Sequence, residues 1–386
     1  MMGRDRKCIS MLIYIILSIL ILTGCWDYQG LGDQTVVAGI AVDLGEESNG
    51  YVLTFEIVDI NGVQDGQFGS ILLTTTGETL AEAVYDAYAR LHNHVYLGVA
   101  DVVIVGREVA EQVGLLPLVN YLVRDKGARN SLRLVVAGTE TAAELFAPAE
   151  EGGGEAEQNQ ASRPLLSQAL SRSLSSRGQG ATVADARAIF EVYHILNRGT
   201  SNLTLPIVGA SDAEDVPFQL DGLALFRGDR MSGTLPETDM PLYLLVTAGL
   251  RDRVFPVEVE EERAVIAVRR SRTTVDFAVV DGALRFFLDI CVTVDAVQFP
   301  DGWGEVSQEM LGQLEAATEQ TLSKQVRELA ERLRDEGHDV LGFAETIRQR
   351  DIGLWEQIVR DAGAWVAESE IDVHVEVRIR DSGMVR

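Results

Sequence analysis

Residues 273–287 have the sequence TTVDFAVVDGALRFF, in which β-branched and aromatic residues flank the pair Asp281-Gly282. Asp-Gly between two such runs favours a two-residue hairpin turn, because both turn positions need a positive φ angle. The stretch therefore predicts an antiparallel hairpin that joins strands over Thr273–Val280 and Ala283–Val297. A long hairpin of this kind must pack its apolar face on a helix or another sheet, which constrains the fold of the surrounding chain.

The chain on either side of this hairpin contains further strand patterns and two helix patterns. The expected strands are Val254–Val259, Arg263–Val268 and Ile371–Ile379. One helix is expected over Gly353–Val366, and a longer helix is expected to end at Gly337. The longer helix has one apolar stripe, which consists of Val306, Met310, Leu314, Ala317, Leu322, Val326, Leu329 and Leu333. Residues 251–386 thus predict a C-terminal α+β domain.

Residues 25–147 predict an N-terminal α+β domain, and residues 165–250 predict a middle domain. In the N-terminal domain the expected strands are Val36–Leu44, Tyr51–Ile60, Ile71–Thr75, Val99–Val105 and Ser131–Gly138, and the expected helices are Thr79–Leu91 and Arg107–Val123. In the middle domain we expect helix over 165–200, strands over Leu203–Val208 and Phe218–Phe226, and a helix or a strand over Pro236–Leu245. The acidic, glycine-rich stretch 148–164 between them has little apolar surface to bury and predicts a flexible linker, which either separates two domains or is an ordinary loop insertion.

The N-terminus carries the strongest targeting signal. Three basic residues within positions 4–7 precede the apolar run Met11–Leu22, which is the order found in an export signal. The sequence LTGC at 22–25 then resembles a bacterial lipobox, with small residues before a cysteine. We therefore expect residues 1–24 to be a lipoprotein signal peptide, cleaved between Gly24 and Cys25, with diacylglycerol on the Cys25 thiol.

An uncleaved transmembrane anchor is the alternative, because residues 8–26 carry no charge and nearly suffice to cross a bilayer. A plain anchor gives Cys25 no role, so the lipoprotein is favoured. Two acyl chains such as palmitate would attach the chain stably to membrane lipid, since each buried CH₂ contributes about 0.8 kcal/mol. The whole sequence thus predicts an α+β fold, a multi-domain lipoprotein with mixed β-sheets flanked by helices.

The charge of the chain excludes one class of partner. It has 33 Lys+Arg and 59 Asp+Glu, a formal net charge of −26. A nucleic-acid-binding protein needs a basic surface, so nucleic acid is not expected as a partner. Cleavage after residue 24 removes three basic residues and one acidic residue, which leaves 30 against 58, or −28. Anionic lipid headgroups repel such a body, so we expect it to stand off the membrane or to dock on a protein.

The sequence lacks the motifs of enzymatic chemistry. It has no phosphate-binding glycine loop with a lysine, no dinucleotide fingerprint and no zinc-binding helix. His92 and His94 could bind a metal as a pair, but a helix-to-strand junction without further ligands favours an exposed turn. Cys291 has acidic neighbours and is expected to be structural, and Trp355 and Trp365 are expected to pack in the core. We expect no catalytic residue, no cofactor and no metal site.

Several short motifs follow one another in a set order and spacing. They are Gly24-Cys25-Trp26-Asp27, Val37–Asp43, Tyr96-Leu97-Gly98, Asp101–Gly106, Arg124-Asp125 with Arg129, Asp339–Glu345, Trp355 and Val373–Ile379 with Gly383. In this order the chain resembles the Ger(x)C family, the lipoprotein C subunits of bacterial spore germinant receptors. Two positions differ from the family pattern: Val99 replaces an expected histidine, and Ala344 replaces the second glycine of Gly-Phe-Gly.

The resemblance implies a non-enzymatic subunit on the outer face of the cytoplasmic membrane, which is the inner membrane of the spore. It implies two membrane partners, the receptor A subunit and the permease-like B subunit, in a receptor for small nutrients. No catalytic or cofactor residues come with the family. Arg124, Asp125 and Arg129 are the polar residues that we expect first at a partner interface, although a helix-end ion pair is the simpler role for them.

An extracytoplasmic solute-binding lipoprotein of a transporter is the alternative function. Proteins of that class consist of two lobes of repeated βαβ units with a ligand cleft between them. The C-terminal region predicts instead a strand meander followed by two helices. The receptor subunit is therefore the favoured interpretation.

Replacement of the lipobox cysteine provides a direct test. Cys25→Ser removes the only thiol at the predicted cleavage site, so the variant should stay unprocessed or be mislocalised. Intact mass spectrometry of the membrane-extracted wild-type protein should show a chain that begins at Cys25 and carries added acyl mass. A mature chain that begins elsewhere, or one without acyl mass, would contradict the lipoprotein prediction.

Overall fold

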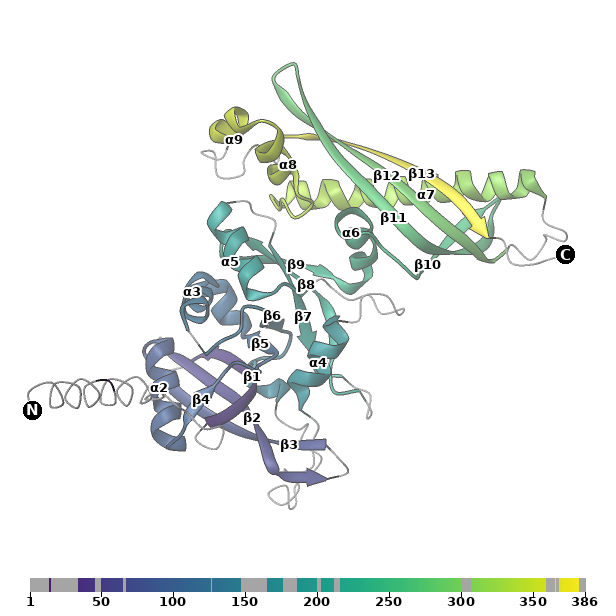
Figure 1. Ribbon diagram of the computed structural model, residues 1–386. Helices are drawn as coiled ribbons and strands as arrows, with labels where there is room; N and C mark the ends of the chain where they lie inside the picture. Colours follow the sequence, from purple (N-terminus) through teal and green to yellow (C-terminus); the bar gives the residue numbers. More distant parts are fainter. Residues whose placement is uncertain are drawn as a thin grey trace, which may run out of the picture.

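The computed structural model describes residues 14, 34–45, 50–64, 67–125, 127–146, 165–175, 186–199, 203–211, 216–299, 307–358, 365 and 368–381. These form two lobes, a larger one built on residues 34–236 and a C-terminal one in which a curved sheet wraps a long helix (Figure 1). Apart from Tyr14, the predicted signal peptide, including Gly24, lies outside the described residues, as do Cys25 and the stretch 148–164. Both lobes combine mixed sheets with helices, which confirms the predicted α+β class.

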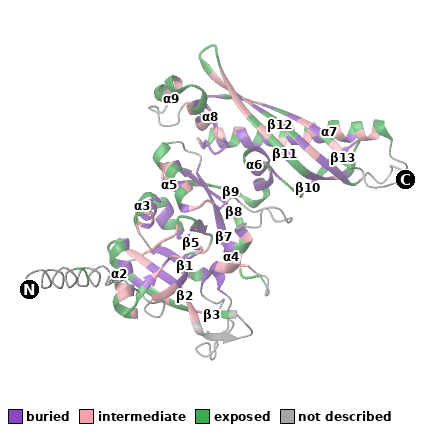
Figure 2. Ribbon diagram, viewed as in Figure 1, coloured by how far each residue is buried: buried purple, intermediate pink, exposed green. Residues whose placement is uncertain are grey.

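Among the described residues, the larger lobe has one nine-stranded sheet with the spatial order β3-β2-β1-β5-β6-β7-β8-β9, and β4 pairs beside β1. The strands are β1 (Gln34–Leu44), β2 (Tyr51–Gln64), β3 (Gln67–Gly77), β4 (His94–Tyr96), β5 (Val102–Val105), β6 (Arg133–Ala137), β7 (Thr204–Gly209), β8 (Gln219–Arg227) and β9 (Arg230–Pro236). The central strands β1, β5, β6 and β7 are parallel, and the outer strands are antiparallel. Figure 2 shows buried residues along these central strands.

Helices cover both faces of this sheet, as parallel strands require. Alternate residues of β5 show the two faces: Val103 and Val105 pack with one set of helices, whereas Val102 and Ile104 pack with another. The first set is α2 (Leu80–Leu91), α3 (Leu116–Arg124) and α5 (Ile189–Arg198), and the second is the 3₁₀ turn η3 (Ala143–Leu145) with α4 (Leu166–Ser175). Strands from the predicted N-terminal and middle domains thus share one sheet.

The helix predicted over Arg107–Val123 is wrong, because the chain breaks at Gly114. A five-residue π-helix, η2 (Val109–Val113), precedes the break, and α3 follows it. Gly114 has a φ angle of +92°, and a Cβ atom there would lie 2.5 Å from the Asp229 carboxylate. The N–H of Leu115 donates to the Asp229 carbonyl at 2.8 Å. A contact with β8–β9 therefore ends the first helical segment.

The C-terminal lobe has a four-stranded sheet in the order β10-β11-β12-β13. Its described strands are β10 (Arg253–Val259), β11 (Glu262–Val280), β12 (Ala283–Gln298) and β13 (Glu370–Asp381). The Asp281-Gly282 hairpin is confirmed, with φ angles of 52° and 86° at the two turn residues. The prediction of separate strands over Arg263–Val268 and Thr273–Val280 is wrong: one strand continues through a register shift between Val268 and Arg270.

Helix α7 (Gln308–Asp335) lies against the concave face of this sheet (Figure 1). Leu314, Leu322 and Val326 from its predicted stripe are fully buried in the core that the helix shares with the sheet. Its N-terminus is capped by Ser307, whose hydroxyl accepts from the Met310 N–H. The predicted long helix is confirmed, and burial of its stripe is what attaches it to the sheet.

The remaining helices, α6, α8 and α9, contribute side chains to the core of the C-terminal lobe. The segment left open between helix and strand, Pro236–Leu245, is a 3₁₀ turn η5 (Glu237–Asp239) and helix α6 (Met240–Thr247). Helix α8 (Phe343–Arg350) was not predicted, and the helix predicted over Gly353–Val366 is described as α9 (Ile352–Ile358), with 359–364 outside the described residues. Trp355 and Trp365 pack on the C-terminal core, as expected.

An aromatic stack joins α8 to the hairpin and gives a stability prediction. The rings of Phe286 and Phe343 lie 4.3 Å apart at an angle of 21°, and both side chains are buried. Phe286→Ala should lower the free energy of unfolding by about 3–5 kcal/mol, because it empties a fully buried aromatic site. Phe287→Ala is the matched control, since its half-buried ring lies on the opposite sheet face and should cost clearly less. Urea denaturation measures both; equal losses would contradict the assigned burial.

Candidate functional site

The expected interface residues Arg124, Asp125 and Arg129 lie together at the C-terminal end of α3 and in the loop that follows it. Arg124 is exposed. The Asp125 carboxylate accepts a hydrogen bond from the Gly127 N–H at 2.6 Å. Arg129 forms an ion pair with Asp101, just before β5. The structure thus brings the three residues to one place, where two of them hold the loop and Arg124 faces solvent.

Asp125 also affects two phenols on neighbouring helices. Burial, together with the nearby Asp125 charge and Tyr88, raises the pKa of Tyr121 to about 12. Burial is the larger cause that raises the pKa of Tyr88, and the negative charge of Asp125 is the smaller cause. Both phenols are therefore neutral at physiological pH, and they provide packing between α2 and α3 rather than acid–base chemistry.

The other candidate residues occupy structural or exposed positions. His92 ends α2 in a left-handed conformation, and His94 begins β4 with its ring edge-on to Tyr88 at 5.6 Å. Both histidines are exposed, as expected for a turn. Cys291 lies on the exposed face of the C-terminal sheet, where its Sγ is 3.8 Å from a Glu376 carboxylate oxygen. Within the described part of the chain, no three His, Cys, Asp or Glu side chains are grouped to hold a metal.

The junction of the two lobes holds several charged groups. Arg227, at the end of β8, donates to the carbonyls of Glu336 and Gly337 at 3.0 and 3.4 Å, beyond the C-terminus of α7. Asp239, from η5, forms an ion pair with Arg332 of α7. A guanidinium at a helix C-terminus also complements the negative end of the helix dipole. These contacts, with α6, join the larger lobe to α7.

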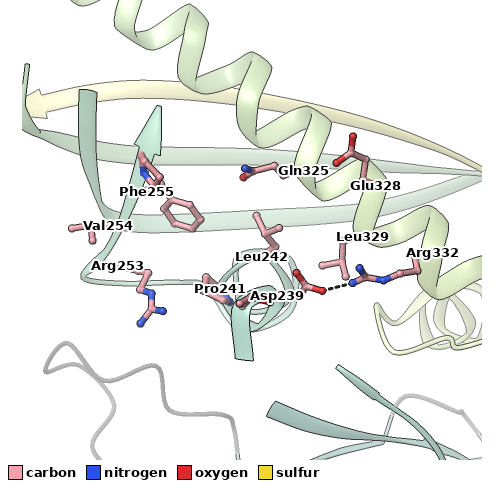
Figure 3. A pocket seen from close by; sticks show the side chains of 12 residues that line it. Asp239, Pro241, Leu242, Arg253, Val254, Phe255, Gln325, Glu328, Leu329 and Arg332 are labelled. Carbon is pink, nitrogen blue, oxygen red and sulfur yellow. Dashed lines mark hydrogen bonds and ion pairs between the residues drawn. The ribbon is translucent and has the colours of Figure 1, made fainter. Parts of the chain in front are cut away.

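A hollow of about 380 Å³ lies beside this junction, between η5, α6, β10 and α7 (Figure 3). Leu242, Phe255 and Leu329 provide its apolar lining, and the Asp239–Arg332 ion pair lies at one side. The hollow is open to solvent, whereas sites for small solutes usually enclose most of the ligand. Its described lining contains no cysteine and no histidine; its hydroxyl is that of Thr238, and the carboxylate of the neighbouring Asp239 is already paired with Arg332.

Two buried titratable residues follow α7. The Asp339 carboxylate accepts from the N–H groups of Phe343 and Ala344, each at 2.8 Å, and so caps α8. Burial raises the pKa of Asp339 to about 7, although both hydrogen bonds oppose the shift. Burial, aided by the nearby Arg227 charge, lowers the pKa of His338. Both residues are nearly inaccessible to solvent, so they stabilise the junction and cannot contact a ligand.

Two further buried carboxylates serve the larger lobe in the same way. Asp43 accepts from the Ala142 and Ala143 N–H groups at 2.7 and 3.1 Å, at the start of η3. Glu56 accepts from the Leu166 and Ser167 N–H groups at 2.7 and 3.0 Å, at the start of α4. Burial is the main cause that raises the pKa of each carboxyl. Anions at helix N-termini are a structural use of acidic residues.

Comparison with known proteins identifies the family. The model of the spore germination protein N-terminal domain matches residues 27–209. The model named spore germination B3/GerAC like, C-terminal, matches residues 221–383. The chain belongs to the Ger(x)C family. This confirms the resemblance that the ordered motifs indicated.

Individual relatives of this Ger(x)C chain span nearly its whole length. Spore germination protein KC of Bacillus subtilis (strain 168) is 22% identical, over 98% of this chain and 97% of that protein. Spore germination protein YndF of the same organism is 21% identical over the full length of both. The crystal structure of the GerBC protein shares the fold, with a TM-score of 0.55 and 15% identity over 88% of this chain and 96% of that one.

Sequence patterns did not indicate the buried carboxylates or the junction residues. Asp43 and Asp339 do stand inside motifs that carry the family resemblance, but the motifs alone do not reveal a cap. Arg227 and Arg332 have no local signal, because their partners lie 109 and 93 residues away along the chain.

Among the described residues, no helix is long and apolar enough to cross a membrane.

The pKa of Asp339 predicts a pH dependence of stability. The carboxyl titrates near 3.8 in the unfolded chain and at about 7 when folded. Between these values only the unfolded chain releases the proton, so the stability that protonated Asp339 contributes is lost as pH rises to about 7. The free energy of unfolding of Asp339→Asn minus that of wild type should therefore increase as pH rises from 4.5 to 7, by up to about 1.4 kcal/mol per pH unit.

Urea denaturation of both proteins at four or five pH values measures this difference. Asp335→Asn, which neutralises an exposed carboxylate on the last turn of α7, is the matched control for loss of one charge. A difference between wild type and Asp339→Asn that stays constant with pH would show that the buried carboxyl titrates near its ordinary value.

Proposed function

We propose that this Ger(x)C protein is a lipid-anchored, non-enzymatic subunit of a spore germinant receptor for nutrients. It is held at the outer face of the cytoplasmic (spore inner) membrane by diacylated Cys25, and it docks on the A subunit and the permease-like B subunit. The observation that carries the proposal is the match of two germination-protein domain models, in order, to residues 27–209 and 221–383.

The roles of the buried titratable groups support a non-enzymatic subunit. Catalytic sites use such groups on substrate, in a cleft, with pKa values set for proton transfer. Here Asp43, Glu56 and Asp339 each accept two backbone N–H groups at a helix start. Their hydrogen-bonding capacity serves the fold, and the described lining of the hollow beside α7 contains no cysteine or histidine.

The charge of the chain supports docking on protein rather than on lipid. At −28 after cleavage of the signal peptide, the body is repelled by anionic headgroups, and a favourable partner surface must offset that repulsion. Electrostatics of this kind sets encounter rate and orientation more than final affinity. Arg124 is the exposed member of the proposed contact set, while Asp125 and Arg129 position the loop that presents it.

The architecture does not favour the alternative of a solute-binding lipoprotein. In that class two similar lobes of βαβ units close over the ligand. The C-terminal lobe here is a four-stranded sheet wrapped on one long helix, unlike the nine-stranded sheet of the other lobe. The hollow at their junction is open, and a salt-bridged Asp239–Arg332 pair already occupies its polar side.

Spore germination tests the proposal. Deletion of the gene should abolish or strongly slow the response to at least one nutrient, and Cys25→Ser should do the same because the untethered chain cannot stay beside its partners. Arg124→Glu should weaken recovery of the two membrane subunits with the tagged chain. Arg107→Glu, an exposed arginine on the same lobe, is its matched control.

Two results would contradict the proposal. One is normal germination of the deletion strain with every nutrient that the parent strain senses. The other is purification of the tagged chain from detergent extracts without any multi-spanning receptor subunit. If Arg107→Glu lowered recovery of the membrane subunits as much as Arg124→Glu, the end of α3 would not be the contact surface.

A further inference from the structure

Among the described residues, the two sheets end on β3, β9, β10 and β13, and the three-residue β4 pairs beside β1 only. Three of the four end strands are protected against addition of another strand. Exposed edges present unpaired N–H and C=O groups, which proteins commonly block with charges, proline or a covering element. At β13, helix α7 performs this task. Glu319 and Glu315 accept from the N–H groups of Val377 and Ile379 at 2.9 and 2.8 Å.

The edges at β9 and β10 carry residues that interrupt pairing. β9 begins with Arg230 and ends with Pro236. β10 has Pro256 at its centre and Glu258 near its end. Proline removes a backbone donor, and a charged side chain on an edge disfavours a second strand.

The fourth edge, β3, has none of these devices. Its sequence, QFGSILLTTTG, contains neither a charged residue nor proline over eleven positions. Phe68, Ile71 and Leu72 are 46, 50 and 38% exposed, although each is large and apolar. A long, uncharged and apolar edge is a template for strand addition, and such an edge is retained where it has a partner. In Figure 1, β3 borders the larger lobe on the side remote from the C-terminal lobe.

Helix α2 covers one half of β3 and shows which groups on the other half point outward. Arg90 donates to the Thr74 carbonyl at 3.2 Å, and the Thr75 hydroxyl donates to the Ala83 carbonyl at 2.8 Å. Because backbone groups alternate in an antiparallel pair, an outward Thr74 carbonyl implies outward groups at Leu72 and Ser70 as well. No described element pairs with the edge at these two residues.

We propose that the Ser70–Leu73 edge of β3 binds an extended segment of a partner protein, which adds a tenth strand to the sheet. The segment is apolar at its centre, to match the exposed Ile71 and Leu72, and carries basic residues, to complement the net negative charge of the chain. The identity of the partner as a membrane subunit of the receptor rests on the proposed function.

Charge decides between this partner and a second copy of the chain. Each mature copy carries −28, so pairing of two β3 edges brings like-charged bodies together without any compensating positive group on the strand. Like charges across an interface are unfavourable, whereas a basic segment gains attraction from the same field.

Lysine substitutions on two edges test the inference in spores. Leu72→Lys should lower recovery of the receptor membrane subunits with the tagged chain about tenfold, equivalent to about 1.4 kcal/mol, and should slow germination. Val254→Lys is the matched control, because Val254 is also an exposed apolar residue on an edge strand, β10. Unfolding temperature and protein level in the spore should stay unchanged for both, and Ile71→Lys is a second variant should Leu72→Lys unfold.

The outcomes separate this inference from the proposed function. A germination defect in the deletion strain with wild-type behaviour of Leu72→Lys and Ile71→Lys would overturn the β3 edge and leave the receptor subunit standing. A dimer of the purified chain that Leu72→Lys converts to monomer would assign the edge to a second copy and overturn the proposal. Strong hydrogen-exchange protection of the Ser70 and Leu72 amides in the isolated monomer would also overturn it, since the chain would then cover its own edge.

Discussion

The C-terminal lobe depends on one set of contacts, in which α7 satisfies the outer edge of β13. β13 lies parallel to β12, and no described strand pairs with its other edge. Two glutamates of α7 accept its N–H groups, and Arg327 donates to the Val373 carbonyl at 3.5 Å. The buried stripe of the same helix fills the concave face of the sheet. Because one helix covers both the face and the edge, sheet and helix fix each other's position.

Local patterns in the sequence were sufficient for much of this fold. The Asp281-Gly282 turn and the stripe of α7 were predictable because each is decided by neighbours within a few residues. Features that depend on long-range contacts were not predictable from the sequence. The break at Gly114 depends on Asp229, and the parallel placement of β13 beside β12 depends on packing across a whole lobe. The continuous β11 was missed because its register shift resembles a loop in sequence.

In the candidate site, too, some residues could be predicted from the sequence and others could not. The order of short motifs was enough to find the family and to single out Arg124, Asp125 and Arg129, but Asp125 and Arg129 prove to be structural as well as polar. The capping carboxylates Asp43 and Glu56 could not be found from sequence, since the backbone groups they bind lie about 100 positions away along the chain. In a chain with many acidic residues, the sequence alone does not show which carboxylate is buried and caps a helix.

The attachment of α7 to the larger lobe has a mechanical consequence. The helix has 28 residues, so at 1.5 Å per residue it is about 42 Å long. Arg227 holds its C-terminal end, while its other end reaches the far side of the curved sheet (Figure 1). A rotation of about 5° at the held end displaces the far end by about 4 Å, because the rigid helix acts as a lever arm. Small strains in the larger lobe are therefore amplified at the distal end of the molecule.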